Sequence, residues 1–290
     1  MEEQLRAEVD ALWQQAEAGN TAPVPGLKVA DEVALRQARL PQIRDVKAEL
    51  AARAQARYEQ EQAAYEEKLA QRRAQEQARR RTVGGRPPKP PEPGPQGTDQ
   101  VHFTDPEARL RPVSGGGFEQ AYNAQVGVDH GRRLIVENHV SQHPNDKQEL
   151  RPALDHLSQL PETLGQVNHL VADNGYFSEA NVKACEPATL TPLLATGRAG
   201  HHPPPAERVA DPGEAPNTTD SVARMEHRLQ TPEGKALYAK RKSTVEPVFG
   251  IIQQVMRFRQ FLLRGLHAVQ GEWNLVCRAY NLKRLHVVTG

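Results

Sequence analysis

The sequence predicts an α/β fold in which a mixed sheet is flanked by helices and preceded by a long helical segment. Residues 119–129 and 133–141 are alternating runs joined by a turn at Gly131, which is the pattern of a β-hairpin. Two short apolar strands, 168–173 and 189–196, then alternate with helical patterns, which is typical of a layered α/β domain.

Composition limits the class of protein further. The chain has 290 residues, a length that fits one large or two small domains. Its net charge of +1 neither requires nor excludes nucleic acid as a partner. Its two cysteines, Cys185 and Cys277, lie far apart and have no metal-ligand spacing, so a disulfide scaffold is excluded. The sequence shows no secretion signal and no apolar run near the roughly 20 residues of a membrane span. We therefore expect a cytoplasmic protein with no membrane association.

Residues 1–82 are predicted to be helical, with helices at 1–20 and 41–82 and a turn at 19–29. The apolar positions of the second helix are mostly alanines, which favours a long solvated helix; a partner-binding coiled coil is the alternative. Residues 83–100 are rich in proline and glycine and predict a linker before a domain at 101–290. A basic run at the end of the helix could contact DNA phosphates or form a solvated face: Arg72, Arg73, Arg79, Arg80 and Arg81.

The domain at 101–290 contains further predicted helices. Asp146 with Glu149 three residues later predicts a capped helix over 146–160, and Ser178 is the predicted cap of a helix over 178–186. Pro192 places the strand 189–196 at a sheet edge, since proline donates no backbone hydrogen bond. The three glycines at 115–117 predict a flexible turn, and 197–218 a loop. The remaining helices are predicted at 219–229, 232–258 and 267–287. In the last of these, Trp273 and Cys277 are one turn apart and predict core packing.

The helix over 232–258 carries the longest apolar stripe of the chain. Glu246 lies beside this stripe, and a carboxylate at the margin of a buried face is costly unless a basic side chain or a metal ion pairs with it. The stripe consists of Val245, Val248, Phe249, Ile252, Val255 and Met256.

A second acidic position is Asp173, which ends the strand 168–173 and is followed by Asn174, Gly175 and Tyr176. Strand ends are where α/β folds place ligands, although an Asx-turn would explain the same residues. Together with Glu246, Asp173 predicts a Mg²⁺ site, because Mg²⁺ prefers oxygen ligands. Phosphoryl transfer by two metal ions needs a third acid, and Asp129 is the nearest candidate by position. For His201 and His202, which lie in a proline-rich loop, we expect no zinc role.

With these residues assigned, the chain resembles the DDE transposases of bacterial insertion sequences, which have an RNase H-like catalytic core. The resemblance implies that 101–290 is this core, that Asp173 and Glu246 are its second and third catalytic acids, and that both bind Mg²⁺ or Mn²⁺. No small-molecule cofactor is expected. Four segments carry the resemblance, in the order of the family: 115–129, 170–185, 238–254 and 258–285.

The same resemblance implies which residues contact DNA. Tyr238 and Arg241 match the Y-x₂-R part of the family's Y-x₂-R-…-E signature, and Arg241 is expected to contact a DNA phosphate. Gln253 stands where family members often carry a lysine. The expected DNA-binding set is Tyr238, Arg241, Lys242, Gln253 and Arg257. The partners implied are the element ends, the target DNA and a second copy of the chain in a homodimer.

One part of the family's pattern is missing from the sequence. The first catalytic aspartate of such enzymes lies in a D-G-T-like segment on the first core strand, and this sequence contains no D-G-T. We therefore expect an N-terminally truncated transposase, weakly active or inactive, without its first core strand. The alternative is a non-catalytic DNA-binding or dimerising remnant that acts through the basic run at 72–81 and through Arg278, Lys283 and Arg284. An RNase H-like nuclease of another kind is a third hypothesis.

Overall fold

A computed structural model describes residues 2–17, 29–82, 84–113, 116–197 and 213–290. The chain divides into two compact units, Met1–Leu110 and Arg111–Gly290. The predicted α/β class is confirmed. The single mixed sheet is not, because the described strands form three two-stranded sheets. The predicted turn before residue 29 and the pair His201-His202 lie outside the described residues. None of the described helices has the length and apolar character to cross a membrane.

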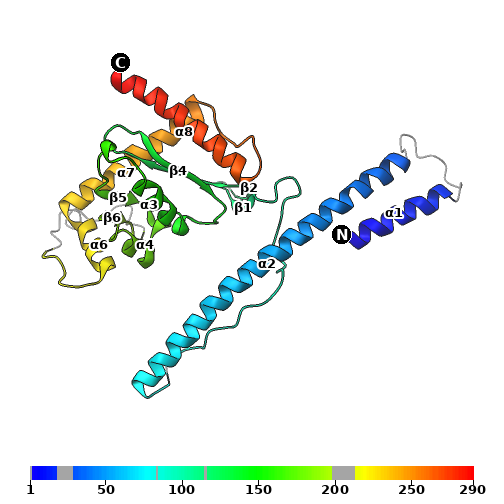
Figure 1. Ribbon diagram of the computed structural model, residues 1–290, viewed down its shortest axis with the longest axis horizontal. Helices are drawn as coiled ribbons and strands as arrows, with labels where there is room; N and C mark the ends of the chain where they lie inside the picture. Colours follow the sequence, from blue (N-terminus) through cyan, green and yellow to red (C-terminus); the bar gives the residue numbers. More distant parts are fainter. Residues whose placement is uncertain (1, 18–28, 83, 114–115, 198–212) are drawn as a thin grey trace. The chain divides into compact units, whose positions relative to one another are not determined.

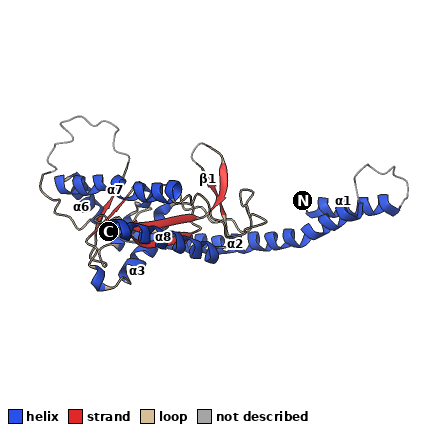
Figure 2. Cartoon of the chain, turned by 90° about the horizontal axis from the view of Figure 1, so that it is seen from above, coloured by secondary structure: helices blue, strands red, loops and turns tan. Residues whose placement is uncertain are grey.

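The first unit is built on two helices that lie side by side, α1 (Glu2–Glu17) and α2 (Val29–Arg79) (Figures 1 and 2). Val9 and Val33 are buried, and Arg36 Nε lies 3.4 Å from Glu8 Oε2. The prediction that this second helix begins at residue 41 is wrong, because it runs through Pro41. Proline removes one hydrogen bond from a helix interior, and packing against α1 supports the turns that precede it.

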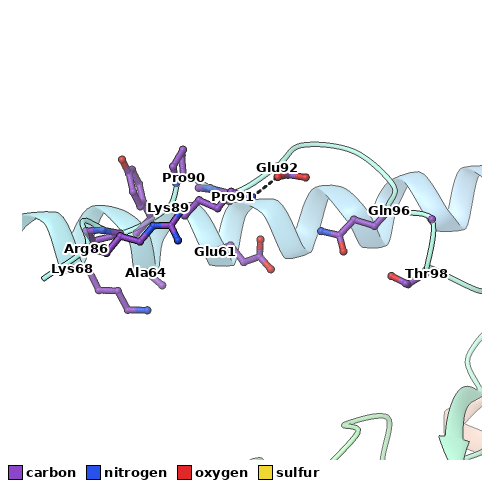
Figure 3. Close-up of a pocket in the computed structure, with 13 residues that line it drawn as sticks. Glu61, Ala64, Lys68, Arg86, Lys89, Pro90, Pro91, Glu92, Gln96 and Thr98 are labelled. Carbon is purple, nitrogen blue, oxygen red and sulfur yellow. Dashed lines mark hydrogen bonds and ion pairs between the residues drawn. The ribbon is translucent and has the colours of Figure 1, made fainter.

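The proline-rich segment that follows α2 has no helix or strand among its described residues, as predicted. It nevertheless lies along α2 (Figure 3), which the sequence did not predict. Arg57 holds it through an ion pair with Asp99 (Nη1 to Oδ1, 2.7 Å) and a hydrogen bond from Nη2 to the Gly94 carbonyl of 3.1 Å. Arg72 of the basic run donates to the Gly85 carbonyl at 3.2 Å. The segment is therefore bound to the helix that precedes it.

The run 119–129, predicted as one strand, forms two. β2 (Phe118–Ala121) pairs with β1 (Arg109–Pro112), a strand that the sequence analysis missed, whereas β3 (Asn123–Val128) pairs with β4 (Ile135–Ser141). The break falls at Tyr122, because the residues on either side of it have different partners. The glycines between β1 and β2 form the predicted turn, with φ of 91° at Gly116 and 94° at Gly117; residue 115 lies outside the described part.

The predicted hairpin is confirmed. β3 and β4 are antiparallel from the pair Asn123–Ser141 to the pair Val128–Ile135, with a register shift after Gly127. Its apolar face packs against α8 (Leu266–Thr289), where Trp273 and Cys277 are buried as predicted, and the Trp273 indole donates to the Gln125 carbonyl at 3.0 Å. Figure 1 shows α8 and α3 on opposite sides of β4.

The opposite face of the hairpin is polar, although it is equally buried. Its inward side chains are Asn123, Gln125, Glu137 and His139. This face is covered by a 3₁₀ turn, η1 (Asp146–Gln148), and by α3 (Leu150–Ser158). The prediction that Asp146 caps this helix is wrong. Asn145 caps η1, where its side chain accepts from the Lys147 amide at 3.2 Å. Glu149 occupies the N-cap position of α3 and makes no side-chain cap hydrogen bond there. The carboxylate of Asp146 turns inward instead.

A second pair of strands is parallel, β5 (His169–Ala172) and β6 (Thr191–Leu194), in register from the pair His169–Thr191 to the pair Ala172–Leu194. Among the described strands β6 pairs with β5 alone, so the edge position predicted from Pro192 is confirmed. Between the strands lie 3₁₀ turns η2 (Glu162–Leu164) and η3 (Asn174–Tyr176) and helix α4 (Glu179–Ala184), which Ser178 caps as predicted. The RNase H-like arrangement of these strands stays a prediction.

The C-terminal helices begin with α6 (Ser221–Gln230) and α7 (Pro232–Gly250). α7 continues into a π-helical turn, η4 (Ile251–Val255), and does not reach residue 258. The wider π turn rotates the residues that follow it away from the buried face. Ile252 is therefore only 1% exposed, whereas Val255 is 57% exposed, although the predicted stripe contains both. Glu246 is also exposed, so the burial cost argued from the sequence does not apply to it.

The π turn leads to a stability prediction. Ile252→Ala should lower the free energy of unfolding by about 2–5 kcal/mol, because it leaves a cavity in the core. Val255→Ala should change it by less than about 0.5 kcal/mol, because that side chain faces solvent. Urea unfolding of both variants measures the difference. Similar losses for the two would show that the apolar stripe continues as a regular α-helix.

Candidate functional site

Asp173 lies directly after β5 and uses its two carboxylate oxygens differently. Oδ1 accepts a hydrogen bond from the Gly175 amide at 2.9 Å, which makes Asp173 the cap of η3. Oδ2 lies 3.6 Å from Nη1 of Arg241, and the side chain is 48% exposed. The Asx-turn that the sequence offered as an alternative is therefore present, and Oδ2 is the oxygen that faces Arg241.

Arg241 reaches Asp173 from α7, which packs against β5. Its guanidinium carbon lies 5.6 Å from the ring centroid of Tyr238, and its Nε is buried without a hydrogen-bond partner. A stacked guanidinium with an unused N–H group is suited to an incoming anion. The structure thus brings together Asp173, Tyr238 and Arg241. Glu246 lies exposed in the same helix.

A second carboxylate, that of Asp146, lies against the same glycine as the Asp173 carboxylate. A β-carbon placed on Gly175 would be 3.0 Å from Asp173 Oδ1 and 3.2 Å from Asp146 Oδ2, so both side chains flank the same glycine. The other oxygen of Asp146 accepts hydrogen bonds from the side-chain amides of Asn123 at 2.9 Å and Gln125 at 2.8 Å. The sequence does not identify Asp146 as part of this site, because the amides that bind its carboxylate come from a strand distant in the chain.

The two turns that carry these carboxylates are braced together. The side-chain amide of Asn181 donates to the Lys147 carbonyl at 2.8 Å and to the Tyr176 carbonyl at 2.7 Å, which joins η1 to η3. The Tyr176 hydroxyl donates to Gln125 Oε1. Burial, reinforced by the nearby carboxylates of Asp146 and Asp173, raises the pKa of Tyr176, so the hydroxyl stays protonated as a donor. These hydrogen bonds therefore fix the two turns that carry Asp146 and Asp173 relative to each other.

A second arginine, Arg111 in β1, has two buried guanidinium nitrogens, Nε and Nη2, with no hydrogen-bond partner among the described residues. Burial lowers the pKa of Arg111, and the charges of Asp146 and Glu149 act in the opposite direction. Unpaired buried donors cost free energy, and a phosphate would satisfy them. Arg241 therefore accompanies Asp173, and Arg111 is influenced by the charge of Asp146.

The other residues assigned from the sequence lie elsewhere in the domain. Asp129 lies in the turn between β3 and β4, where its carboxylate accepts from the Arg132 amide at 2.7 Å. Its assignment as a third catalytic acid stays a prediction. Lys242, Gln253 and Arg257 are exposed, and Arg257 has a φ of 60° at the helix end. Their DNA contacts stay predictions as well.

The donor set around Asp173 fits a hard divalent cation. Such ions bind carboxylate and carbonyl oxygens, and Asp173 and Asp146 place two carboxylates beside Gly175. Arg241 compensates part of the negative charge at this point.

Residues 214–286 match a family model described as a transposase DDE domain. This segment contains Tyr238, Arg241 and Glu246 but not Asp173, and it covers less than half of the chain. The match supports a DDE-type transposase, a family that typically uses divalent metal ions and acts on DNA. No curated protein and no solved structure matches the chain.

The close approach at Gly175 gives a prediction. Gly175→Ala should lower the free energy of unfolding by about 1–3 kcal/mol, because the new methyl group pushes on two fixed carboxylates. Gly271→Ala is the matched control: it lies in α8, where a β-carbon would meet nothing within 4 Å, and should be stabilising by about 0.5–1 kcal/mol. Urea unfolding compares the two. A neutral Gly175→Ala would mean that the carboxylates are free to move.

Proposed function

We propose that this chain is a DNA transposase that cleaves and joins DNA strands with Asp173 and Glu246 as ligands of divalent metal ions, in an RNase H-like core at 101–290. The observation that carries the proposal is the contact between Arg241 and Asp173 at 3.6 Å. It joins the end of β5 to the helix that carries Tyr238, Arg241 and Glu246. Two segments that carry the family resemblance, far apart in the sequence, therefore meet at one site.

Bound Mg²⁺ or Mn²⁺ would supply activation of the attacking oxygen and stabilisation of the leaving oxygen. Asp173 and Glu246 are the proposed oxygen ligands, and Asp146 adds a carboxylate next to Asp173. The brace through Asn181 and Tyr176 holds the turns that carry Asp146 and Asp173, so little reorganisation is needed when a substrate binds.

The arginines of the site are the proposed phosphate contacts. Arg111 and Arg241 both have buried N–H groups without partners, and a phosphate oxygen would accept from them. Lys242, Gln253 and Arg257, which are exposed in α7, in η4 and just after it, are proposed as further DNA contacts. DNA is therefore the proposed partner, bound through its backbone at the site of cleavage.

Homodimerisation is the remaining part of the proposal. Leu275 and Leu282 are exposed on α8 and lie seven residues apart, so they share one face of the helix. A second copy of the chain would cover such a face. Light scattering of the purified chain, with Leu282→Glu as the comparison, measures this.

A non-catalytic DNA-binding protein is the second candidate. The ion pair between Arg241 and Asp173 favours this candidate, because Arg241 already offsets the charge that a metal ion would need. Arg278 and Lys283 of α8 are exposed, whereas Arg284 donates to the Arg132 carbonyl at 2.8 Å. DNA binding that survives the loss of Asp173 and Glu246, without any metal-dependent cleavage, would identify this function.

The catalytic assignment predicts a loss of metal binding and of cleavage together. Asp173→Asn should weaken Mn²⁺ binding at least about tenfold. It should also abolish the weak Mn²⁺-dependent nicking of supercoiled plasmid that we expect of the wild-type chain. Asp155→Asn, an exposed aspartate of α3, is the control and should change neither. Calorimetric Mn²⁺ titration gives the first value, and gel analysis of the plasmid gives the second. Equal behaviour of the two variants would remove Asp173 from the metal site.

The phosphate contacts predict a change in the salt dependence of DNA binding. Arg241→Ala and Arg111→Ala should each weaken binding to a duplex of any sequence and lower the slope of log K against log salt by about 1. Arg151→Ala, an exposed arginine of α3, should leave the slope unchanged. Fluorescence anisotropy over a range of salt concentrations measures the slope. An unchanged slope for both site variants would place the DNA elsewhere.

A further inference from the structure

The buried polar face of the β3–β4 hairpin carries a group of ionisable side chains that the proposed DNA site does not use. Glu137 and His139 project from β4, and His156 comes from α3. One ligand atom of each, a carboxylate oxygen or an imidazole nitrogen, lies within 4.8 Å of the others. Two imidazoles and one carboxylate on two rigid elements form a donor set that transition-metal ions bind.

The contacts within this group have the arrangement of a metal site and its outer shell. Glu137 Oε1 lies 2.7 Å from His139 Nδ1 and 3.0 Å from His156 Nδ1. The other nitrogen of His139, Nε2, lies 2.8 Å from Glu149 Oε2. A metal-binding histidine usually donates its second N–H to a carboxylate, which fixes the ring and its tautomer. Glu149 is fully buried and occupies this position.

The same contacts are difficult to satisfy with a neutral imidazole. Both nitrogens of His139 face carboxylate oxygens, and a neutral ring has one N–H group to donate. A cation at the Nδ1 side would satisfy the remaining lone pairs. Glu137 and His139 are buried, whereas the His156 side chain is 46% exposed, which leaves an entry path from solvent.

We propose that Glu137, His139 and His156 bind a Zn²⁺ ion that links β4 to α3, with His139 held by Glu149. Zn²⁺ takes such mixed nitrogen and oxygen ligands at about 2.0–2.2 Å in tetrahedral geometry, so the ligand atoms separate to about 3.3 Å when it binds. The present contacts of 2.7 and 3.0 Å need to open by only a few tenths of an ångström. Water takes the fourth position, on the exposed side of His156.

This site is distinct from the proposed catalytic one in residues and in chemistry. The catalytic proposal uses carboxylates, which suit Mg²⁺ or Mn²⁺, whereas two imidazoles favour Zn²⁺. The zinc ion would fix α3 on the hairpin. It would also stabilise the polar layer that includes Asp146, because Glu149 follows η1 directly.

The chain contains a matched pair of histidines for the test. His156 and His143 are half-exposed, at 46% and 43%, and each places Nδ1 against a buried glutamate, His156 at 3.0 Å from Glu137 and His143 at 2.8 Å from Glu149. Only His156 belongs to the proposed ligand set. His156→Ala should therefore weaken Zn²⁺ binding, and His143→Ala should not.

The full chain is first freed of metal with a chelator. It is then titrated with zinc chloride in a calorimeter, in a buffer that contains excess Mg²⁺. Wild-type and His143→Ala proteins should bind one Zn²⁺ with the same affinity, and His156→Ala should lose at least about tenfold, since even an outer-shell partner contributes about 10–100-fold. Zn²⁺ should raise the melting temperature of the first two proteins and not of the third.

Two outcomes would overturn the proposal. Absence of stoichiometric Zn²⁺ binding by the wild-type chain would mean that His139 bridges its two glutamates through hydrogen bonds alone. Equal losses in His143→Ala and His156→Ala would indicate adventitious binding by surface histidines. Excess Mg²⁺ in the titration keeps this result separate from the catalytic proposal, because carboxylate-only sites are then already filled.

Discussion

The arrangement of this domain depends on hydrogen bonds that satisfy the buried polar face of the β3–β4 hairpin. One side of the β3–β4 hairpin packs on α8 through apolar contacts, which need no specific geometry. The other side buries Asn123, Gln125, Glu137 and His139, and each of these must find a partner or cost free energy. Asp146 is the partner of Asn123 and Gln125, and Glu149 is the partner of His139. Glu137 is paired with His139 and His156. The position of η1 and α3 is therefore set by hydrogen-bond geometry, which is far more directional than apolar contact.

This constraint explains why Asp146 lies beside Asp173. Asp146 is held by two amides of β3, and the turn that contains it is joined through Asn181 to the turn that contains Asp173. Carboxylates of like charge at one site repel one another unless positive charge offsets them. Arg241 offsets the charge of Asp173, and the charges of Asp146 and Glu149 act on Arg111. Among the described residues both arginines retain buried donors without a partner.

The sequence predicted those features that depend on local pattern. The hairpin, the cap at Ser178, the edge position of Pro192 and the burial of Trp273 and Cys277 all follow from spacing or from the chemistry of one residue. The resemblance also singled out Asp173 and Arg241, which the structure brings together. The features that it missed depend on partners distant in the chain. The local sequence around Asp146 predicts a helix cap, and its true role depends on hydrogen bonds from Asn123 and Gln125. β1 is a strand because it pairs with β2.

The end of α7 shows a further conflict between local and functional demands. After the π turn, the Phe258 amide bonds the Ile252 carbonyl at 3.0 Å and the Met256 amide bonds the Ile251 carbonyl at 2.9 Å, which closes the helix. Arg257 completes this closure with a φ of 60°. Glycine is the residue that takes this conformation at little cost, whereas a residue with a β-carbon pays about 1–2 kcal/mol. The side chain of Arg257 lies in solvent, so packing does not offset this strain. The π turn and the two hydrogen bonds that close the helix hold the backbone of Arg257 in this conformation, and they leave its guanidinium exposed for the DNA contact proposed above.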